Sequence, residues 1–210
     1  MMNYIEILKR SDLFKNVSGE TIEGILEETG NRVKSYDEGS VVIKTDSGFK
    51  DIGIVLNGNV CIKGIGDYTP GRTFGIKLAA AKVVNPFEIY AAEVSEIMFI
   101  NYGKLIKCAG KNFQGFYRVV ENITELISQE NLSLNERISV LSQNGLRNKL
   151  LEFFRIQKVI HGDNVLSLNM SRLEIADYLC VDRCSLSREL TKLRKEGLIE
   201  IDKQKITLMH

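Results

Sequence analysis

The 210-residue sequence has few of the features that mark secreted, fibrous or membrane-spanning proteins. It contains two prolines and four cysteines, too few for a collagen-like chain or for a disulfide scaffold of this size. No apolar run approaches the roughly 18 residues of a membrane span, and the first ten residues lack the apolar core of a signal peptide. We therefore expect a cytoplasmic protein with no membrane partner.

An excess of one charge is also absent, because 28 Lys and Arg residues nearly balance 27 Asp and Glu residues. This balance excludes a polycationic nucleic-acid coat. The split along the chain is uneven: residues 142–210 hold 12 basic and 9 acidic residues, whereas residues 1–141 hold 16 and 18. Any basic surface is therefore expected in the C-terminal third.

Catalytic and metal-binding motifs are missing as well. The chain has no GxSxG, no phosphate-cradling GxxxxGKS or GxxxxGKT, and no HExxH. Of its two histidines, His161 is expected in a turn and His210 is the last residue. Cys180 and Cys184 could form a redox pair or half a zinc site, but no nearby His or Cys completes one, so we expect a buried Cys180 and a partly exposed Cys184. We expect no enzyme, no metal and no cofactor.

The N-terminal half predicts helix followed by many short strands. Residues 3–30 are amphipathic and helical in pattern, whereas residues 32–105 alternate short Val- and Ile-rich runs with glycine-containing turns. Many short strands with glycine-rich turns are typical of an antiparallel barrel or sandwich. The predicted strands are Val41–Ile43, Ile52–Leu56, Val60–Ile62, Ile89–Tyr90 and Ile97–Ile100.

Residues 112–143 predict one long helix, which at about 30 residues would span about 45 Å. Its apolar residues recur at near-heptad steps, with the polar Glu130 interrupting them, which favours a dimer seam. An interdomain spine, or a core helix packed on the barrel, is the alternative. The candidate seam residues are Phe116, Val120, Ile123, Ile127, Leu134 and Ile138.

The C-terminal third predicts a winged helix-turn-helix. A helix from Leu146 to Ile160 precedes a strand at Val165–Leu168. Ser171 and Glu174 then form a capping-box pattern at the start of a short helix. The apolar face of this helix consists of Leu173, Ile175, Ala176 and Leu179. Asp182 is placed to cap a second helix, whose Leu186, Leu190 and Leu193 face inward. Gly197 ends that helix before a two-stranded ribbon over Ile199–Leu208.

The second helix of such a unit enters the DNA major groove with its N-terminal side chains leading. Arg183, Ser187 and Arg188 lie there, and an Arg guanidinium matches the O6 and N7 acceptors of guanine. A solvated basic face is the alternative. The residues predicted to contact DNA are Ser171, Arg172, Arg183, Ser185, Ser187, Arg188 and Lys192.

These motifs resemble the Crp/Fnr superfamily of bacterial transcription regulators over nearly the whole chain. Matching stretches are Asp37–Gly39, Val55–Val60, Pro70-Gly71, Phe74-Gly75, Leu173–Leu179 and Asp182–Leu190. The resemblance implies an α+β fold in three parts: a cyclic-nucleotide-binding-like antiparallel jelly-roll barrel (1–111), a dimerisation helix (112–143) and a winged helix-turn-helix (144–210). It also implies binding to a palindromic operator in double-stranded DNA, with RNA polymerase as a further partner.

Three departures from the sequence pattern of this family limit which of its ligands and DNA contacts we expect here. The Glu and the Arg-Ser or Arg-Thr pair that hold cyclic AMP are replaced by Ile76 and Pro86-Phe87, and residues 73–103 contain no Arg. We therefore expect an unidentified small-molecule effector in place of a cyclic nucleotide, in a pocket lined by Phe74, Gly75, Ile76, Pro86 and Phe87. The N-terminal cysteine cluster of iron–sulfur members is absent, since Cys61 comes first. Cys184 replaces a base-reading Glu, so the operator preference should differ there.

The resulting hypothesis is a homodimeric, sequence-specific DNA-binding regulator. The alternative is a small-molecule-binding sensor module in which DNA binding is vestigial.

Overall fold

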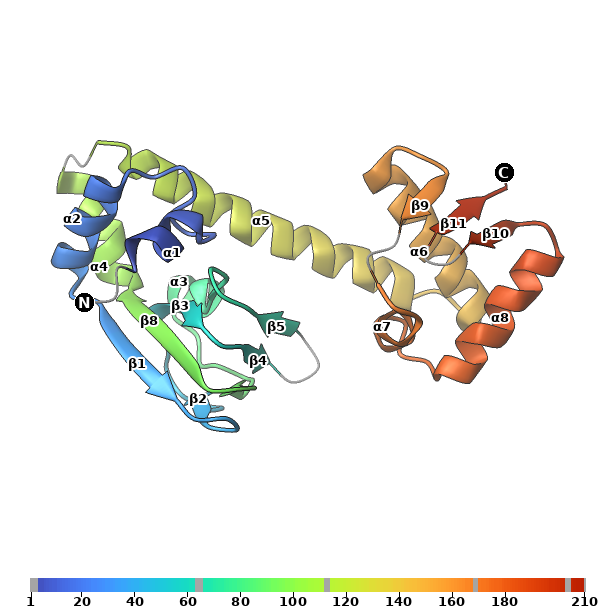
Figure 1. The fold of residues 1–210 in the computed structure, drawn as a ribbon, viewed down its shortest axis with the longest axis horizontal. Helices are drawn as coiled ribbons and strands as arrows, with labels where there is room; N and C mark the ends of the chain where they lie inside the picture. Colours follow the sequence, from blue (N-terminus) through green and yellow to red (C-terminus); the bar gives the residue numbers. More distant parts are fainter. Residues whose placement is uncertain (1–3, 63–65, 112–113, 168–169, 203–204, 210) are drawn as a thin grey trace. The chain divides into compact units, whose positions relative to one another are not determined.

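The computed structural model describes residues 4–62, 66–111, 114–167, 170–202 and 205–209 (Figure 1). The chain divides into two compact units, residues 1–129 and 130–210, and each is described by itself. The boundary lies within the helix α5 (Phe116–Leu141), which is continuous over 26 residues. The long helix predicted over 112–143 is confirmed for this range.

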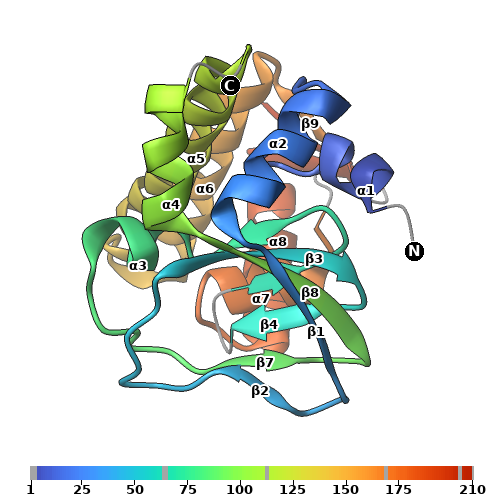
Figure 2. The same ribbon diagram turned by 90° about the vertical axis from the view of Figure 1, so that its left-hand side faces the viewer.

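The first unit contains two four-stranded antiparallel sheets, in the strand orders β1-β8-β3-β6 and β2-β7-β4-β5 (Figure 2). This arrangement confirms the predicted antiparallel jelly roll. Apolar runs had indicated β2, β3, β4, β7 and β8, but the mostly polar β1 and β5 and the two-residue β6 lacked that signal. The bounds are β1 Arg32–Tyr36, β2 Val41–Ile43, β3 Asp51–Asn57, β4 Val60–Ile62, β5 Gly66–Tyr68, β6 Thr73–Phe74, β7 Ile89–Ala91 and β8 Ser95–Asn101.

Alternation along β3 and β8 gives this unit two cores, one on each face of the first sheet. Ile52 and Ile54 of β3 and Ile100 of β8 pack under the helices, whereas Val55 and Phe99 lie between the two sheets. Successive side chains of a strand point to opposite faces, so these buried strands separate the two cores. The helices are α1 Ile5–Arg10, α2 Gly19–Thr29, α3 Ile76–Ala81 and α4 Tyr102–Lys107, with a 3₁₀ turn at Cys108–Lys111 (Figure 2).

The second unit has the predicted winged helix-turn-helix order, around a core that includes Leu150, Phe153, Leu186 and Leu190. The predicted two-stranded ribbon is part of a three-stranded sheet, because β9 pairs with β11 in the order β10-β11-β9. Leu168 of the predicted strand lies outside the described residues. The bounds are α6 Gly145–His161, β9 Val165–Ser167, α7 Arg172–Tyr178, α8 Arg183–Lys195, β10 Ile199–Asp202 and β11 Lys205–Leu208.

Candidate nucleic-acid interface

Both helices of the helix-turn-helix begin at the predicted caps. The Ser171 hydroxyl accepts a hydrogen bond from the Glu174 amide at 3.2 Å, and the Glu174 carboxylate accepts one from the Ser171 amide at 2.6 Å. This reciprocal capping box begins α7 and keeps the pKa of Glu174 below its usual value through hydrogen bonding to Ser171. Asp182 Oδ1 accepts from the Ser185 amide at 2.8 Å and begins α8.

The turn between the two helices is a Schellman motif centred on Cys180. The Cys180 amide donates to the Asp177 carbonyl at 3.1 Å, and the Val181 amide donates to the Ala176 carbonyl at 3.0 Å. Cys180 adopts the left-handed conformation at φ 55°. The C-terminal end of α8 has the same motif, with Gly197 in the left-handed position at φ 72°. The expectation of a buried Cys180 is wrong: its side chain is exposed, because the left-handed turn leaves it outside the core.

We expect Cys180→Gly to raise the free energy of unfolding by about 0.5–1 kcal/mol. The left-handed conformation costs a side chain about 1–2 kcal/mol, and the more flexible unfolded chain of the glycine variant offsets only part of the gain. Urea denaturation followed by circular dichroism measures the change. Cys184→Gly is the matched control, because Cys184 lies in the first turn of α8 and glycine there should destabilise, by up to about 1 kcal/mol. A Cys180→Gly variant less stable than wild type would contradict the conformational argument.

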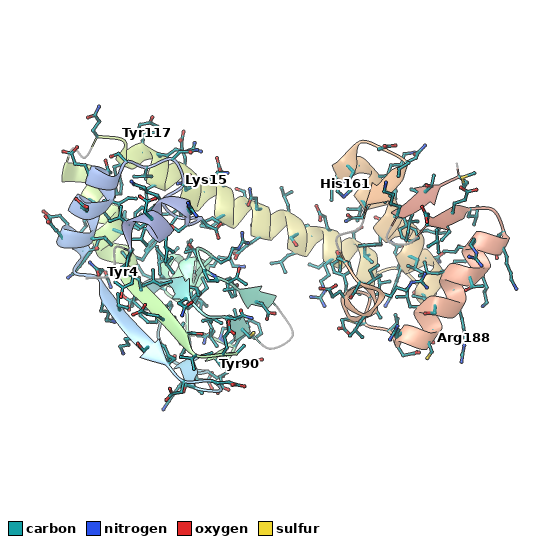
Figure 3. The ribbon with its side chains drawn as sticks, in the orientation of Figure 1. Tyr4, Lys15, Tyr90, Tyr117, His161 and Arg188 are labelled. Carbon is teal, nitrogen blue, oxygen red and sulfur yellow. The ribbon has the colours of Figure 1, made fainter. Side chains whose placement is uncertain are left out.

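The outward face of α8 is basic. Leu186, Leu190 and Leu193 are buried against the unit's core, as predicted. Arg188 projects outward from the helix on the opposite side (Figure 3), and Arg183 and Lys192 are also exposed. Ser171 and Arg172, at the start of α7, are exposed as well. Two predicted DNA contacts are less accessible, since Ser185 and Ser187 are half-buried.

The acidic side chains near α8 are turned away from this face. The Glu189 side chain is only 13% exposed and lies 3.6 Å from the Arg147 guanidinium of α6. Arg147 also forms a two-pronged ion pair with Glu196, which lies just beyond α8. Lys192 is the one basic residue of the predicted face with an acidic contact among the described residues, to Glu189 at 3.4 Å. The outward face therefore presents positive charge, the sign that DNA phosphates require.

Two further exposed residues lie on the same face: Lys195, which was not among the predicted DNA contacts, and Cys184, which was predicted only to replace a base-reading Glu. Lys195 follows Arg188 by seven residues and Cys184 precedes it by four, so both lie on the Arg188 side of the helix, and both are exposed. The helical spacing alone carried this signal. Leu173, predicted on the apolar face of α7, is 56% exposed and adds an apolar side chain to the surface beside Arg172.

The predicted seam residues of α5 divide into two groups. Phe116 and Ile123 are 5% and 6% exposed because they pack in the helix-side core of the first unit. They are therefore unavailable to a partner, and for these two residues the structure favours the alternative of a core helix packed on the barrel. Val120, Leu134 and Ile138 are 41%, 48% and 65% exposed, and Ile127 is half-buried.

The five residues assigned to an effector pocket are not brought together. Phe74 lies between the two sheets, with its ring over Gly53, where a Cβ would approach to 2.2 Å. Gly75 then reverses the chain at φ 81°, so that Ile76 begins α3 in the helix-side core. Pro86 and Phe87 are exposed. Phe74 and Ile76 therefore lie in different cores, and Pro86 and Phe87 lie at the surface.

No group of three or more His, Cys, Asp or Glu side chains within the described residues is placed to hold a metal. Cys61 and Cys108 are buried thiols, and burial together with a hydrogen bond to Asp67 raises the pKa of Cys61 to about 11. His161 is the last residue of α6 and not part of a turn, and His210 lies outside the described residues. No helix in the part of the chain that the structure describes is long and apolar enough to cross a membrane.

Comparison with known proteins gives one family and many solved structures. Residues 146–210 match the family described as the Crp-like helix-turn-helix domain. CprK in complex with OCPA is 15% identical with a TM-score of 0.58, covering 91% of this chain and 90% of that one. CLP, the c-di-GMP responsive global regulator of Xanthomonas campestris, is 17% identical with a TM-score of 0.53, covering 92% and 100%. The catabolite activator protein of Thermus thermophilus is 16% identical with a TM-score of 0.51, covering 94% and 93%. Curated protein sequences gave no match.

The capped helix pair, its basic outward face and the three-stranded wing define a winged helix-turn-helix of the DNA-binding class. More narrowly, residues 146–210 match the Crp-like helix-turn-helix domain, and the predicted resemblance to Crp/Fnr regulators is confirmed in this domain and in the fold. Together, the domain and the fold support a DNA-binding transcriptional regulator.

Proposed function

We propose that the protein is a homodimer that reads a palindromic operator through α8 and responds to a small molecule bound by its jelly roll. The observation that carries this proposal is the composition of the outward face of α8. Arg183, Arg188 and Lys192 are exposed, while Glu189 is turned toward Arg147. A helix face whose basic side chains point outward, and whose acidic side chain is held by an arginine of α6, can contact phosphates and guanine.

The proposed dimer uses the exposed face of α5. Val120, Ile127, Leu134, Ile138 and Leu141 are separated by 7, 7, 4 and 3 residues, the spacing of a and d positions in a coiled coil. A parallel two-fold pairing of this face would carry two recognition helices about 34 Å apart, one turn of DNA. We also propose three functional parts: a sensor barrel over 1–111, a dimerisation helix over 112–143 and a DNA-binding domain over 144–210.

We further propose that the barrel does not bind cyclic nucleotides. The space between its sheets is occupied by rings, with Phe74 5.6 Å from Tyr68 and 6.4 Å from Phe99 between ring centroids. Ile76, at the position where the resembling family uses a ribose-binding acid, is 6% exposed in the helix-side core. A cyclic phosphate buried without a paired cation would cost several kcal/mol, on the order of a broken buried ion pair.

Selection from a random pool of double-stranded DNA tests the function. We expect the full chain to enrich an inverted repeat whose half-sites are centred about one helical turn apart. The affinity for the enriched sequence should fall steeply with salt, as phosphate contacts release counterions. A shuffled version of the enriched sequence is the control. Equal affinity for both sequences, or no enrichment, would favour the alternative, a sensor module with vestigial DNA binding.

A further inference from the structure

A basic cleft of about 450 Å³ opens at one edge of the jelly roll. Its walls come from β1 and β2, each of which is an edge strand of one sheet, and from the segment Ser47–Asp51, which ends at the first residue of β3. The five residues expected to form the effector pocket do not line it. The cleft is therefore a separate feature of the barrel.

Four basic side chains line the cleft against one acid. The acid, Asp51, is nearly buried and already satisfied: Arg32 forms an ion pair with its carboxylate, and the Asn101 amide donates to it at 3.1 Å. Arg32 is thus neutralised locally. The other three bases, Lys34, Lys44 and Lys50, have no ion pair among the described residues. Three uncompensated lysines around one concave surface favour an anionic ligand.

The floor of the cleft is aromatic. The centroid of the Phe99 ring lies 6.3 Å from that of Phe49 and 6.5 Å from that of Tyr36, both in edge-on arrangements. The Arg32 guanidinium lies 5.6 Å from the centroid of Phe99. An inorganic anion would use the lysines alone, whereas an anion attached to an apolar body could also contact these rings.

A second, apolar cleft of about 390 Å³ adjoins the first and shares Phe49 and Lys50 with it. Val83 and Val84 line this second cleft and are 49% and 55% exposed. Gly75 allows the Phe49 ring to lie between the clefts, since a Cβ there would come within 2.3 Å of the ring. An apolar group that packs against these exposed valines would remove both apolar surfaces from water, which is favourable in free energy.

We propose that the two clefts form one binding site for a small organic anion with an apolar body. The carboxylate or phosphate of the ligand pairs with Lys34, Lys44 and Lys50, and its apolar body lies against Phe49, Val83 and Val84. A DNA duplex does not fit this assignment, because its phosphates lie on a rod far wider than a concave cleft of this volume. The site rests on the sensing role proposed above, for which it supplies the class of ligand.

Titration calorimetry of the full chain without DNA tests the site, with 2-naphthoate and 2-naphthyl phosphate as probes. Both anions should bind. The neutral 2-naphthylmethanol, which lacks the negative charge, and inorganic phosphate, which lacks the apolar body, should each bind at least about tenfold more weakly. The stronger of the two naphthyl probes shows whether the site prefers a carboxylate or a phosphate. Failure of both to bind overturns the proposal, as does equal binding of the neutral alcohol.

Paired variants separate the site from general charge. Lys34→Gln with Lys50→Gln should weaken binding of the naphthyl anions about tenfold or more. Lys15→Gln with Lys107→Gln removes the same charge from exposed positions that do not line either cleft and should leave binding unchanged (Lys15 is labelled in Figure 3). Equal weakening by both pairs overturns the proposal. Operator selection is a separate measurement, so a wild-type chain that selects DNA but binds neither naphthyl anion contradicts the site and not the regulator.

Discussion

Leu134→Glu together with Ile138→Glu should convert the protein into monomers and lower its affinity for the operator by about a hundredfold or more. In a monomer, binding of one DNA-binding domain to its half-site no longer brings a second domain to the other half-site. Both side chains are already exposed in the single chain, at 48% and 65%, so the substitutions should leave each unit folded. In a parallel dimer, both positions would meet their own copies across the two-fold axis. Four buried carboxylates at one seam would repel one another without a cation to pair with.

Sedimentation velocity and operator binding measure the two effects. Leu132→Glu is the matched control, because Leu132 is 61% exposed on the same helix but lies off the a and d positions. It should remain dimeric and bind normally. Ile123→Glu is unsuitable as a test, since Ile123 is buried in the helix-side core and the change would disrupt the first unit itself. A wild-type chain that is monomeric at micromolar concentration, or a dimeric double variant, would contradict the proposed seam.

Arg188→Ala and Lys192→Ala should give different phenotypes on DNA. Arg188 lies within the first two turns of α8 on its outward face, without an ion pair among the described residues, so its guanidinium is available to a guanine. Its removal should cost about 1–3 kcal/mol on the preferred operator and flatten the preference at one base pair of each half-site. Lys192 lies one turn further along, in contact with Glu189, and is expected to reach phosphate.

Binding selection with both variants beside wild type measures the difference. Lys192→Ala should weaken all sequences similarly and lower the salt slope by roughly one unit for each phosphate that the lysine no longer neutralises. Lys15→Ala, in the first unit and distant in sequence from the helix-turn-helix, serves as the charge control and should change neither quantity. If Arg188→Ala keeps the wild-type base preference and only binds more weakly, Arg188 contacts phosphate and the assigned reading residue is wrong.

The helix-turn-helix could be predicted from the sequence because local interactions define it. Ser171 and Glu174 cap each other across three residues, Asp182 caps α8 across three more, and the leucines of α8 repeat with the helical period. Each of these signals is complete within about two turns of helix. The long helix was predictable for the same reason, since its period of apolar residues runs without a proline from Phe116 to Leu141.

By itself, then, the sequence determined the helices from α5 to α8, the caps of the helix-turn-helix, an antiparallel barrel or sandwich and the basic outward face of α8. It did not indicate α3 and α4, which lie within and at the end of the region predicted as short strands. The tertiary structure alone decided which apolar residues are covered. Periodicity gives the spacing of a stripe but not what packs on it, so Phe116 and Ile123 are in the core while Leu134 and Ile138 are exposed. The basic cleft was equally beyond the sequence, because Lys34, Lys44 and Lys50 belong to separate segments that only the pairing of strands into two sheets brings to one edge.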